Sequence, residues 1–236
     1  MKKLICFDLD GTLTQHRTPL TQDTADFLKK LEKKYKLIMV GAGDVMRIHK
    51  QMNCFPIEII GNYGMQQGNV IDGEFKVTKQ IVMPVNKDFF NEQCAYLREK
   101  YGYTQYDGEH VEFHSSGMVT FPMLGTKAPI EKKVAFDPTR EKRKVLYPEV
   151  LQIFSDYSVY IGGSSSFDFS PKEYNKYHAV MRYAEQNGYK KDEILYVGDD
   201  FGVGGGDSHI ALGGIDYVEI TDYKTVTQKL QYLLEE

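Results

Sequence analysis

The sequence has few cysteines, no long hydrophobic run and no excess of positive charge. Its three cysteines, Cys6, Cys54 and Cys94, are an odd number without CxxC spacing. This predicts buried or partly buried free thiols in a reducing cytoplasm and excludes a metal site built from sulfur. The net charge of −4 provides no field that would attract nucleic acid or an anionic membrane. We therefore expect a cytoplasmic protein with neither as a partner.

Two short charged stretches have ordinary interpretations. The opening MKK resembles the start of a signal peptide, but only four apolar residues precede Asp8, which is too few for the hydrophobic region of such a peptide. No later run approaches the length of a membrane span. The basic run TREKRK, residues 139–144, is short and lies beside a helical pattern, so we interpret it as a solvated helix face.

The first third of the chain alternates strand and helix patterns. With 236 residues, 42% hydrophobic and 26% charged, the chain can form one large or two small globular domains. Buried strands are predicted at KLICF, KLIMV and IEII, with helices at residues 22–35 and 44–52 between them. A hairpin is predicted for residues 62–75. Strand–helix alternation of this kind indicates an α/β fold with a parallel sheet.

The pattern changes after VMPVN, residues 82–86. Helices are predicted at residues 87–101 and 139–154, each followed by a pair of strands, and the order αββαββ is that of a separate α+β layer. Helix–strand alternation returns from residue 175 to the end. We therefore expect a Rossmann-like core domain made of residues 1–83 and 172–236, and an inserted domain made of residues 84–171. The sequence has no repeats and no low-complexity segment.

Acidic residues follow two of the predicted parallel strands. Asp8 and Asp10 end the first strand, and Asp199 ends a later one, with Asp207 after the glycine-rich stretch GVGGG. Lys176 opens a helix behind a plausible N-cap residue. Because the carboxyl ends of parallel strands share one edge of the sheet, these groups can converge there. Clustered carboxylates repel one another unless a hard cation such as Mg²⁺ neutralises them.

This set of groups suits phosphoryl transfer. A carboxylate can accept the phosphoryl group as an aspartyl phosphate, while a cation and an ammonium group stabilise the charge on its oxygens. A second acid two residues away can protonate the leaving oxygen and later activate the acceptor. Backbone amides of a glycine-rich turn can bind the remaining oxygens.

The motif DLDGTLT, followed by a lysine and a GD…D element, resembles the signature of the haloacid dehalogenase superfamily of aspartyl-phosphate phosphotransferases. The segments VEFHSSGM, YIGGSSSFDFSPKEYNK and VGDDFGVGGGD are similar to those of eukaryotic-type phosphomannomutases, so the resemblance covers nearly the whole chain. It implies that the inserted domain is a substrate-specificity cap of the Cof or IIB type, which closes over the core and excludes water.

Residue roles follow from this resemblance. Asp8 would be the nucleophile, Asp10 the acid and base, and Lys176 the phosphate-binding lysine. Thr12 and the surrounding loop amides would contact phosphate. The implied Mg²⁺ ligands are Asp8, Asp199, Asp207 and the backbone carbonyl of Asp10.

The sequence departs from the family pattern at two places. The serine or threonine that the family has after the second strand is replaced by GAGD, so that at Gly43 we expect backbone amides or a water to hold phosphate. The cap arginines of the phosphomannomutases correspond to His114, Thr126 with Lys127 beside it, and Lys133. Lysine and histidine cannot reproduce the bidentate fork of arginine. We keep His114, Lys127 and Lys133 as expected substrate-binding residues.

Several structural interpretations compete with these roles. Asp8 and Asp10 could form only an Asx turn, and Lys172 competes with Lys176 for the lysine role. Asp200 is expected to face solvent or support the metal ligands from behind. His110 and His114 could be ordinary strand residues.

Two further segments have alternative interpretations. GVGGGD lacks the spacing of a dinucleotide-binding loop. The aromatic segment YLREKYGYTQY is expected to pack within the cap rather than to stack on bases.

We expect a Mg²⁺-dependent enzyme that hydrolyses a small phosphorylated metabolite such as a sugar phosphate. The alternative is a phosphomannomutase-type hexose phosphate mutase, which would need a strong second phosphate site in the cap. A second alternative is a sugar-phosphate sensor without catalysis. The oligomeric state stays open, with a homodimer formed through the cap as one option.

Overall fold

The computed structural model describes residues 1–235, which form two compact units. The first unit contains Met1–Ile81, Asn175–Gly202 and the chain from Asp207 onward, and the second contains Val82–Tyr174 and Val203–Gly206. The segment 203–206, which the sequence assigned to the core, groups with the second unit because the amide of Ile161 donates to the carbonyl of Gly204 at 2.8 Å.

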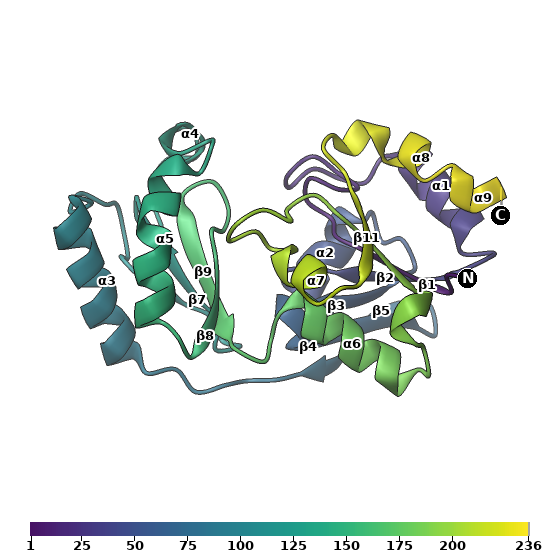
Figure 1. Ribbon diagram of the computed structural model, residues 1–236, viewed down its shortest axis with the longest axis horizontal. Helices are drawn as coiled ribbons and strands as arrows, with labels where there is room; N and C mark the ends of the chain where they lie inside the picture. Colours follow the sequence, from purple (N-terminus) through teal and green to yellow (C-terminus); the bar gives the residue numbers. More distant parts are fainter. Residues whose placement is uncertain (236) are drawn as a thin grey trace. The chain divides into compact units, whose positions relative to one another are not determined.

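A seven-stranded sheet forms the centre of the first unit (Figure 1). Its order is β11 (Asp216–Glu219), β10 (Ile194–Gly198), β1 (Leu4–Phe7), β2 (Lys36–Val40), β3 (Glu58–Gly61), β4 (Gln66–Ile71) and β5 (Glu74–Gln80). The first five are parallel to one another, whereas β4 pairs antiparallel with β3 and β5 pairs antiparallel with β4. The predicted hairpin is therefore part of the main sheet, which makes the sheet mixed.

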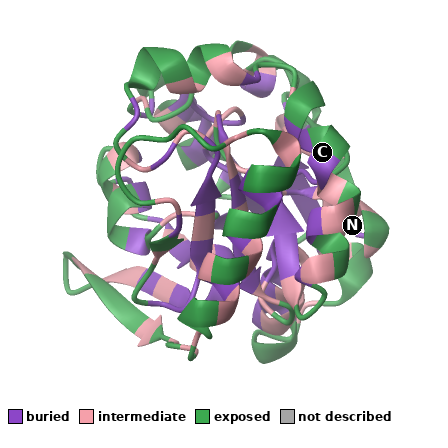
Figure 2. Ribbon diagram, turned by 90° about the vertical axis from the view of Figure 1, so that its left-hand side faces the viewer, coloured by how far each residue is buried: buried purple, intermediate pink, exposed green. Residues whose placement is uncertain are grey.

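Helices cover both faces of this sheet. They are α1 (Gln22–Leu31), α2 (Val45–Gln51), α6 (Lys176–Gln186), α7 (Ser208–Leu212), α8 (Val226–Lys229) and α9 (Tyr232–Glu235), with 3₁₀ turns at Asn62–Gly64, Lys191–Glu193 and Tyr223–Thr225. In β1, Ile5 and Phe7 pack in one core cluster, and Leu4 and Cys6 pack in the other. Figure 2 shows buried strands at the centre of the view and helices that are exposed on their outer sides. In the first unit's sheet, β1, β2 and β10 are almost entirely buried, whereas the edge strands β5 and β11 are mostly exposed. A strand that is buried on both faces has a continuous run of apolar residues, and this run allowed the strand LICF to be predicted from the sequence.

The second unit is an antiparallel sheet packed against helices. The sheet order is β6 (Glu112–Phe113), β7 (Val119–Pro122), β9 (Ser166–Pro171) and β8 (Tyr157–Tyr160), and the helices are α3 (Lys87–Tyr101), α4 (Ile130–Phe136) and α5 (Glu141–Ile153). The apolar core includes Phe90, Phe121, Phe167 and Phe169. Helix α4 was not predicted; it is only seven residues long, and none of its residues is buried.

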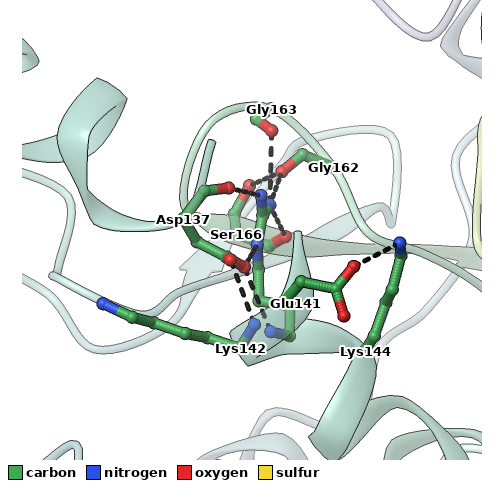
Figure 3. Close-up of polar contacts among 8 residues, drawn as sticks. Asp137, Glu141, Lys142, Lys144, Gly162, Gly163 and Ser166 are labelled. Atoms are coloured by element: carbon green, nitrogen blue, oxygen red, sulfur yellow. Dashed lines mark hydrogen bonds and ion pairs between the residues drawn. The ribbon is translucent and has the colours of Figure 1, made fainter. Parts of the chain in front are cut away.

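The basic run at residues 139–144 differs from the prediction at one position. Arg143 is 1% exposed, and its Nε lies 2.9 Å from Oδ2 of Asp137. Its Nη1 donates to the carbonyls of Gly162, Gly163 and Ser166 at 2.7, 3.2 and 3.0 Å (Figure 3). The interpretation as a solvated face was wrong for this residue, because the guanidinium ties α5 to the loop before β9.

The cysteines also differ from the prediction in part. Cys6 and Cys94 are buried, but Cys54 is exposed, in a turn after α2 where its backbone has a positive φ of 57°. All three thiols are free. Within residues 1–235, no helix combines the length and the apolar character needed to cross a membrane.

Candidate active site

Asp8 and Asp199 come together because the strands that precede them are paired. Phe7 of β1 lies opposite Val197 of β10 in a parallel register, and the amide of Asp8 donates to the carbonyl of Val197 at 2.9 Å. One oxygen each of Asp8, Asp199 and Asp207 lies within 4.8 Å of the others. The edge of the parallel sheet therefore carries a cluster of three carboxylates.

Lys176 is the cation inside this cluster. The side chain of Asn175 accepts from the amide of His178 at 2.8 Å and begins helix α6, and Lys176 is the first residue of that helix. Its Nζ lies 2.8 Å from Oδ1 of Asp8 and 2.8 Å from Oδ1 of Asp207. The competing residue, Lys172, instead donates to the carbonyl of Ser155.

Asp207 is fully buried and has a donor at each of its acceptor positions. Its Oδ1 accepts from Lys176 and from the hydroxyl of Tyr196 at 2.6 Å. Its Oδ2 accepts from the amides of Asp199 and Asp200 at 3.2 and 3.1 Å. Because a carboxylate offers about four lone-pair positions, Asp207 holds the lysine and the loop, whereas Asp8 and Asp199 keep oxygens that a cation could bind.

The pKa values of the acids reflect this crowding. Burial raises the pKa of Asp8 to about 8, opposed by Lys176 and reinforced by Asp207 and Asp199. Burial and the neighbouring Asp207 raise the pKa of Asp199 to about 6, opposed by Lys176. Burial alone would lower the pKa of Lys176, but the charges of Asp207 and Asp8 hold it well above its usual value. A cluster of oxygen donors with more negative than positive charge suits a hard divalent cation.

The loop after Asp8 fixes the orientation of Asp199. Thr12 is fully buried, and its hydroxyl donates to Oδ1 of Asp199 at 3.0 Å. Gly11 has a φ of +92°, and a Cβ there would lie 2.2 Å from Oδ2 of Asp199. The position therefore requires glycine. The hydroxyl of Thr12, expected to contact phosphate, is thus engaged with a carboxylate of the site.

Asp10 is held away from the carboxylate cluster by three donors. Its Oδ1 accepts from the amide of Arg17 at 2.7 Å and from Nε2 of Gln51 at 2.6 Å, and its Oδ2 lies 3.3 Å from Nη1 of Arg47. Burial alone would raise the pKa of Asp10, but these three groups together lower it by more, so that the pKa of Asp10 lies below its usual value. Arg47 and Gln51 were not predicted, although their spacing of four places them on one face of α2.

Gly43 lies between β2 and α2, beneath the side chain of Arg47. A Cβ at Gly43 would be 2.0 Å from Nη2 of Arg47. The space that a side chain at position 43 would use is therefore occupied by a guanidinium group. This group was not expected, since only backbone amides or a water were predicted there.

His114 belongs to a polar chain in the second unit. Its Nε2 lies 3.0 Å from the hydroxyl of Thr120, which donates to Oδ1 of Asp168 at 2.8 Å. Burial raises the pKa of Asp168, while Thr120 and the charge of His114 lower it in part. Asp168 and Thr120 were not predicted as site residues. Each lies directly between two apolar residues of its strand, and this alternation of polar and apolar residues was the available signal.

The two predicted lysines of the second unit differ in their contacts. Nζ of Lys133 donates to the carbonyl of Thr126 at 2.9 Å, and the side chain of Lys127 is exposed. His110 contacts the side-chain oxygen of Asn91 at 3.1 Å. In the aromatic segment, Tyr101 and Tyr103 pack against the core of this unit, as predicted, whereas Tyr96 and Tyr106 are exposed.

A cavity of about 490 Å³ opens in the first unit beside Asp199. It is lined by Gly11, Gln15, His16, Asp199, Ile220, Thr221, Asp222 and Tyr223. This volume lies in the range of small-molecule sites, so the carboxylate cluster has room for a ligand at its border.

Comparison with known proteins agrees with the motif. The model of a family described as haloacid dehalogenase-like hydrolase matches residues 5–201. Phosphomannomutase 1 of Dictyostelium discoideum is 30% identical over 225 residues, which are 88% of this chain and 86% of that protein. Phosphomannomutase of Drosophila melanogaster is 29% identical over 96% of this chain and 89% of its own.

Solved structures share the fold at low identity. The IMP-nucleotidase of Plasmodium falciparum superposes with a TM-score of 0.70 and 13% identity over 100% of this chain and 68% of that one. A phosphatase of the haloalkanoate superfamily from Bacteroides thetaiotaomicron gives a TM-score of 0.64 and 15% identity, covering 99% and 95% of the two chains. At such identities the likeness concerns the fold alone.

Proposed function

The chain belongs to the haloacid dehalogenase-like hydrolase family, as a phosphatase or a phosphomannomutase-like phosphotransferase, and we propose that it transfers a phosphoryl group from a small phosphorylated metabolite to Asp8. The observation that carries this proposal is the placement of Asp8 beside the ammonium of Lys176, at 2.8 Å, in a cluster with Asp199 and Asp207. We propose hydrolysis of a sugar phosphate as the overall reaction.

In the first step, an oxygen of Asp8 forms a bond to phosphorus while the bond from phosphorus to the ester oxygen breaks. Asp10 gives its proton to the leaving oxygen, and the alcohol departs. In the second step, Asp10 removes a proton from water as the water oxygen attacks phosphorus. The bond to Asp8 then breaks, so that inorganic phosphate leaves and both aspartates return to their starting states.

Asp10 must change its contacts during this cycle. Its three observed donors favour the carboxylate form, which is the form needed for the second step. To act as an acid in the first step, Asp10 must carry a proton, and a protonated oxygen cannot accept from Gln51 or Arg47 as the carboxylate does. We infer that the side chain leaves at least one of these donors when it turns toward the leaving oxygen.

The donor set suits Mg²⁺, with Asp8 and Asp199 as carboxylate ligands and the backbone carbonyl of Asp10 as a third. Asp207 lies within the same group of oxygens and adds negative charge while holding Lys176. When bound, Mg²⁺ would neutralise the acids and polarise the phosphoryl oxygens. Lys176 supplies the second positive charge from this chain's own residues.

A mutase is the second candidate, and the relatives favour it. The alignments with the proteins named phosphomannomutase cover between 86 and 98% of the length of this chain. A mutase must retain a bisphosphorylated sugar between its two half-reactions, which requires a strong phosphate site in the second unit. His114, Lys127 and Lys133 lack the arginine fork for that task, and Lys133 already donates to a backbone carbonyl. This favours water as the acceptor.

The test is turnover with Mg²⁺ over a panel of hexose and pentose phosphates, with and without a hexose bisphosphate. Release of inorganic phosphate and formation of the isomer are followed in the same samples, with Asp8→Asn as the inactive control. Phosphate without isomer supports hydrolysis. Conversion of mannose 1-phosphate to mannose 6-phosphate only when bisphosphate is present supports the mutase. No turnover on any member would contradict both and support a sensor.

A further inference from the structure

The contact between Gly43 and Arg47 suggests a role for the arginine that the proposed chemistry does not yet use. The guanidinium lies where a side chain at position 43 would project, with Nη2 2.0 Å and Nε 2.5 Å from the position of a Cβ. Gly43 follows β2, the strand next to β1 in the sheet. The arginine is thereby brought to the same sheet edge as the carboxylates.

The charge balance at this edge favours a further cation beside Mg²⁺ and Lys176. A phosphate monoester arrives with negative charge at a site that holds four aspartates, and Lys176 is already shared between Asp8 and Asp207. Arg47 is a further cation in contact with one of these acids. Its side chain is 41% exposed and lies 3.3 Å from Oδ2 of Asp10, so a ligand can reach it.

The contacts of Arg47 are arranged so that it can exchange one partner. Its contact with Asp10, at 3.3 Å, is long, whereas Nη1 donates to Oε1 of Gln51 at 2.7 Å. Gln51 also donates to Asp10 at 2.6 Å, so the glutamine holds both groups. A guanidinium has five donors and matches phosphate oxygens in a bidentate manner. Arg47 can therefore bind phosphate while Gln51 keeps it in place.

We propose that Arg47 binds the transferring phosphoryl group through its guanidinium, and that position 43 is glycine because any side chain would displace that group. The inference rests on the proposed function, since it assigns a substrate contact in the same site. It also makes Asp10 and phosphate alternative partners of Arg47, so that arrival of the substrate frees Asp10 to turn toward the leaving oxygen.

The experiment measures binding of inorganic phosphate and of orthovanadate by isothermal titration calorimetry in the presence of Mg²⁺. The variants are Arg47→Met, Arg47→Lys, Gly43→Ser and the double variant Gly43→Ser with Arg47→Met. Lys50→Met is the matched control, because it removes one positive charge from an exposed position of the same helix. Circular dichroism and thermal melts establish that each variant is folded.

We expect Arg47→Met to weaken phosphate binding about 10- to 100-fold, the loss typical of a hydrogen bond to a charged group. Arg47→Lys should fall between Arg47→Met and the wild type. Gly43→Ser should weaken binding in the wild type because the new Cβ moves the guanidinium, yet have little further effect once Arg47 is absent. Lys50→Met should bind as the wild type does.

Two results would overturn the inference. One is an unchanged phosphate Kd in Arg47→Met together with a lower kcat, which would limit Arg47 to positioning Asp10. The other is strict additivity of Gly43→Ser and Arg47→Met, which would mean that the two positions act independently. In both cases the wild type still binds phosphate and turns over substrate, so the proposed function stands. A wild type that does neither overturns the function as well.

Discussion

Asp207 and Tyr196 support the carboxylate cluster through buried hydrogen bonds. Asp207 accepts four hydrogen bonds and is fully buried. We expect Asp207→Asn to lower the free energy of unfolding by about 3 kcal/mol, because one partner of a buried pair is removed. Tyr196→Phe removes one hydrogen bond and should cost about 1 kcal/mol.

Urea unfolding monitored by fluorescence or circular dichroism measures both changes. Tyr196→Phe serves as the control because it keeps the volume and all the charges of the cluster. If both variants lose the same free energy of unfolding, Asp207 does not stabilise the cluster more than a single hydrogen bond does, and the prediction is wrong.

Lys176 is expected to matter for both binding and turnover. Lys176→Met keeps the length of the side chain but leaves Asp8 and Asp207 without their ammonium. We expect turnover on the best substrate of the panel to fall at least 100-fold, the scale of losing one group that stabilises the transition state. Steady-state kinetics measures this, with Lys172→Met as the control, since Lys172 is exposed and donates to a backbone carbonyl elsewhere.

For the candidate site, the sequence predicted the convergence of acids that follow strands, but not the contacts that Arg47 and Gln51 make with Asp10 from a helix face. Asp8 and Asp199 could be placed because parallel strands end at one edge, and the resemblance supplied Lys176. Arg47 and Gln51 could not, since the direction of a long side chain depends on the space around it. That space exists only because position 43 is glycine.

At the scale of the element, apolar pattern decided which predictions succeeded. Strands β1 and β2 are buried on nearly every residue, so their sequences are continuous apolar runs. Helix α4 has only seven residues and buries none of them, so it contributes no residue to the core pattern. The start of α5 depends on Asp137, whose carboxylate accepts from the amides of Lys142 and Arg143 at 3.0 Å each. That contact is not apparent from helical periodicity.

The pair between Asp137 and Arg143 predicts a pH-dependent stability. Burial alone would raise the pKa of Asp137. Hydrogen bonds from the Arg143 side chain and from two backbone amides lower it by more, so that the pKa of Asp137 lies below its usual value. A carboxyl group with a lowered pKa stabilises the fold above its unfolded pKa of about 3.9. That contribution is lost as the pH falls through the folded value.

We expect Asp137→Asn to lower the free energy of unfolding by about 3 kcal/mol at pH 7. The difference from the wild type should shrink as the pH falls below about 4. Urea unfolding across this range measures it. Glu141→Gln is the control, because Glu141 is 71% exposed and its pair with Lys144 should contribute less than about 1 kcal/mol. A difference that does not change with pH would contradict the assignment.

At the scale of the whole molecule, the carboxylate cluster belongs to the first unit, and the buried ion pair of Asp137 and Arg143 belongs to the second. A ligand that binds only the folded first unit should stabilise it by mass action. We expect Mg²⁺ and beryllium trifluoride together to raise the melting temperature more than the sum of their separate effects, because the phosphoryl mimic on Asp8 and the cation share that carboxylate. Asp8→Asn should abolish this coupling.

Hydrogen–deuterium exchange separates the two units in the same sample. Addition of Mg²⁺ and beryllium trifluoride should slow exchange mainly in residues 8–14, at the start of α6 and in residues 198–202 and 207–208, which belong to the first unit and contain the clustered carboxylates and Lys176. Asp137→Asn should speed exchange mainly in α5 and in the loop at residues 162–166, because Arg143 then loses the partner that holds it against three carbonyls. Since each perturbation acts through contacts within one unit, each pattern should leave the core strands of the other unit unchanged. Uniform slowing or uniform loosening across both units would mean that the protein opens as a single cooperative body, and would contradict this division of roles.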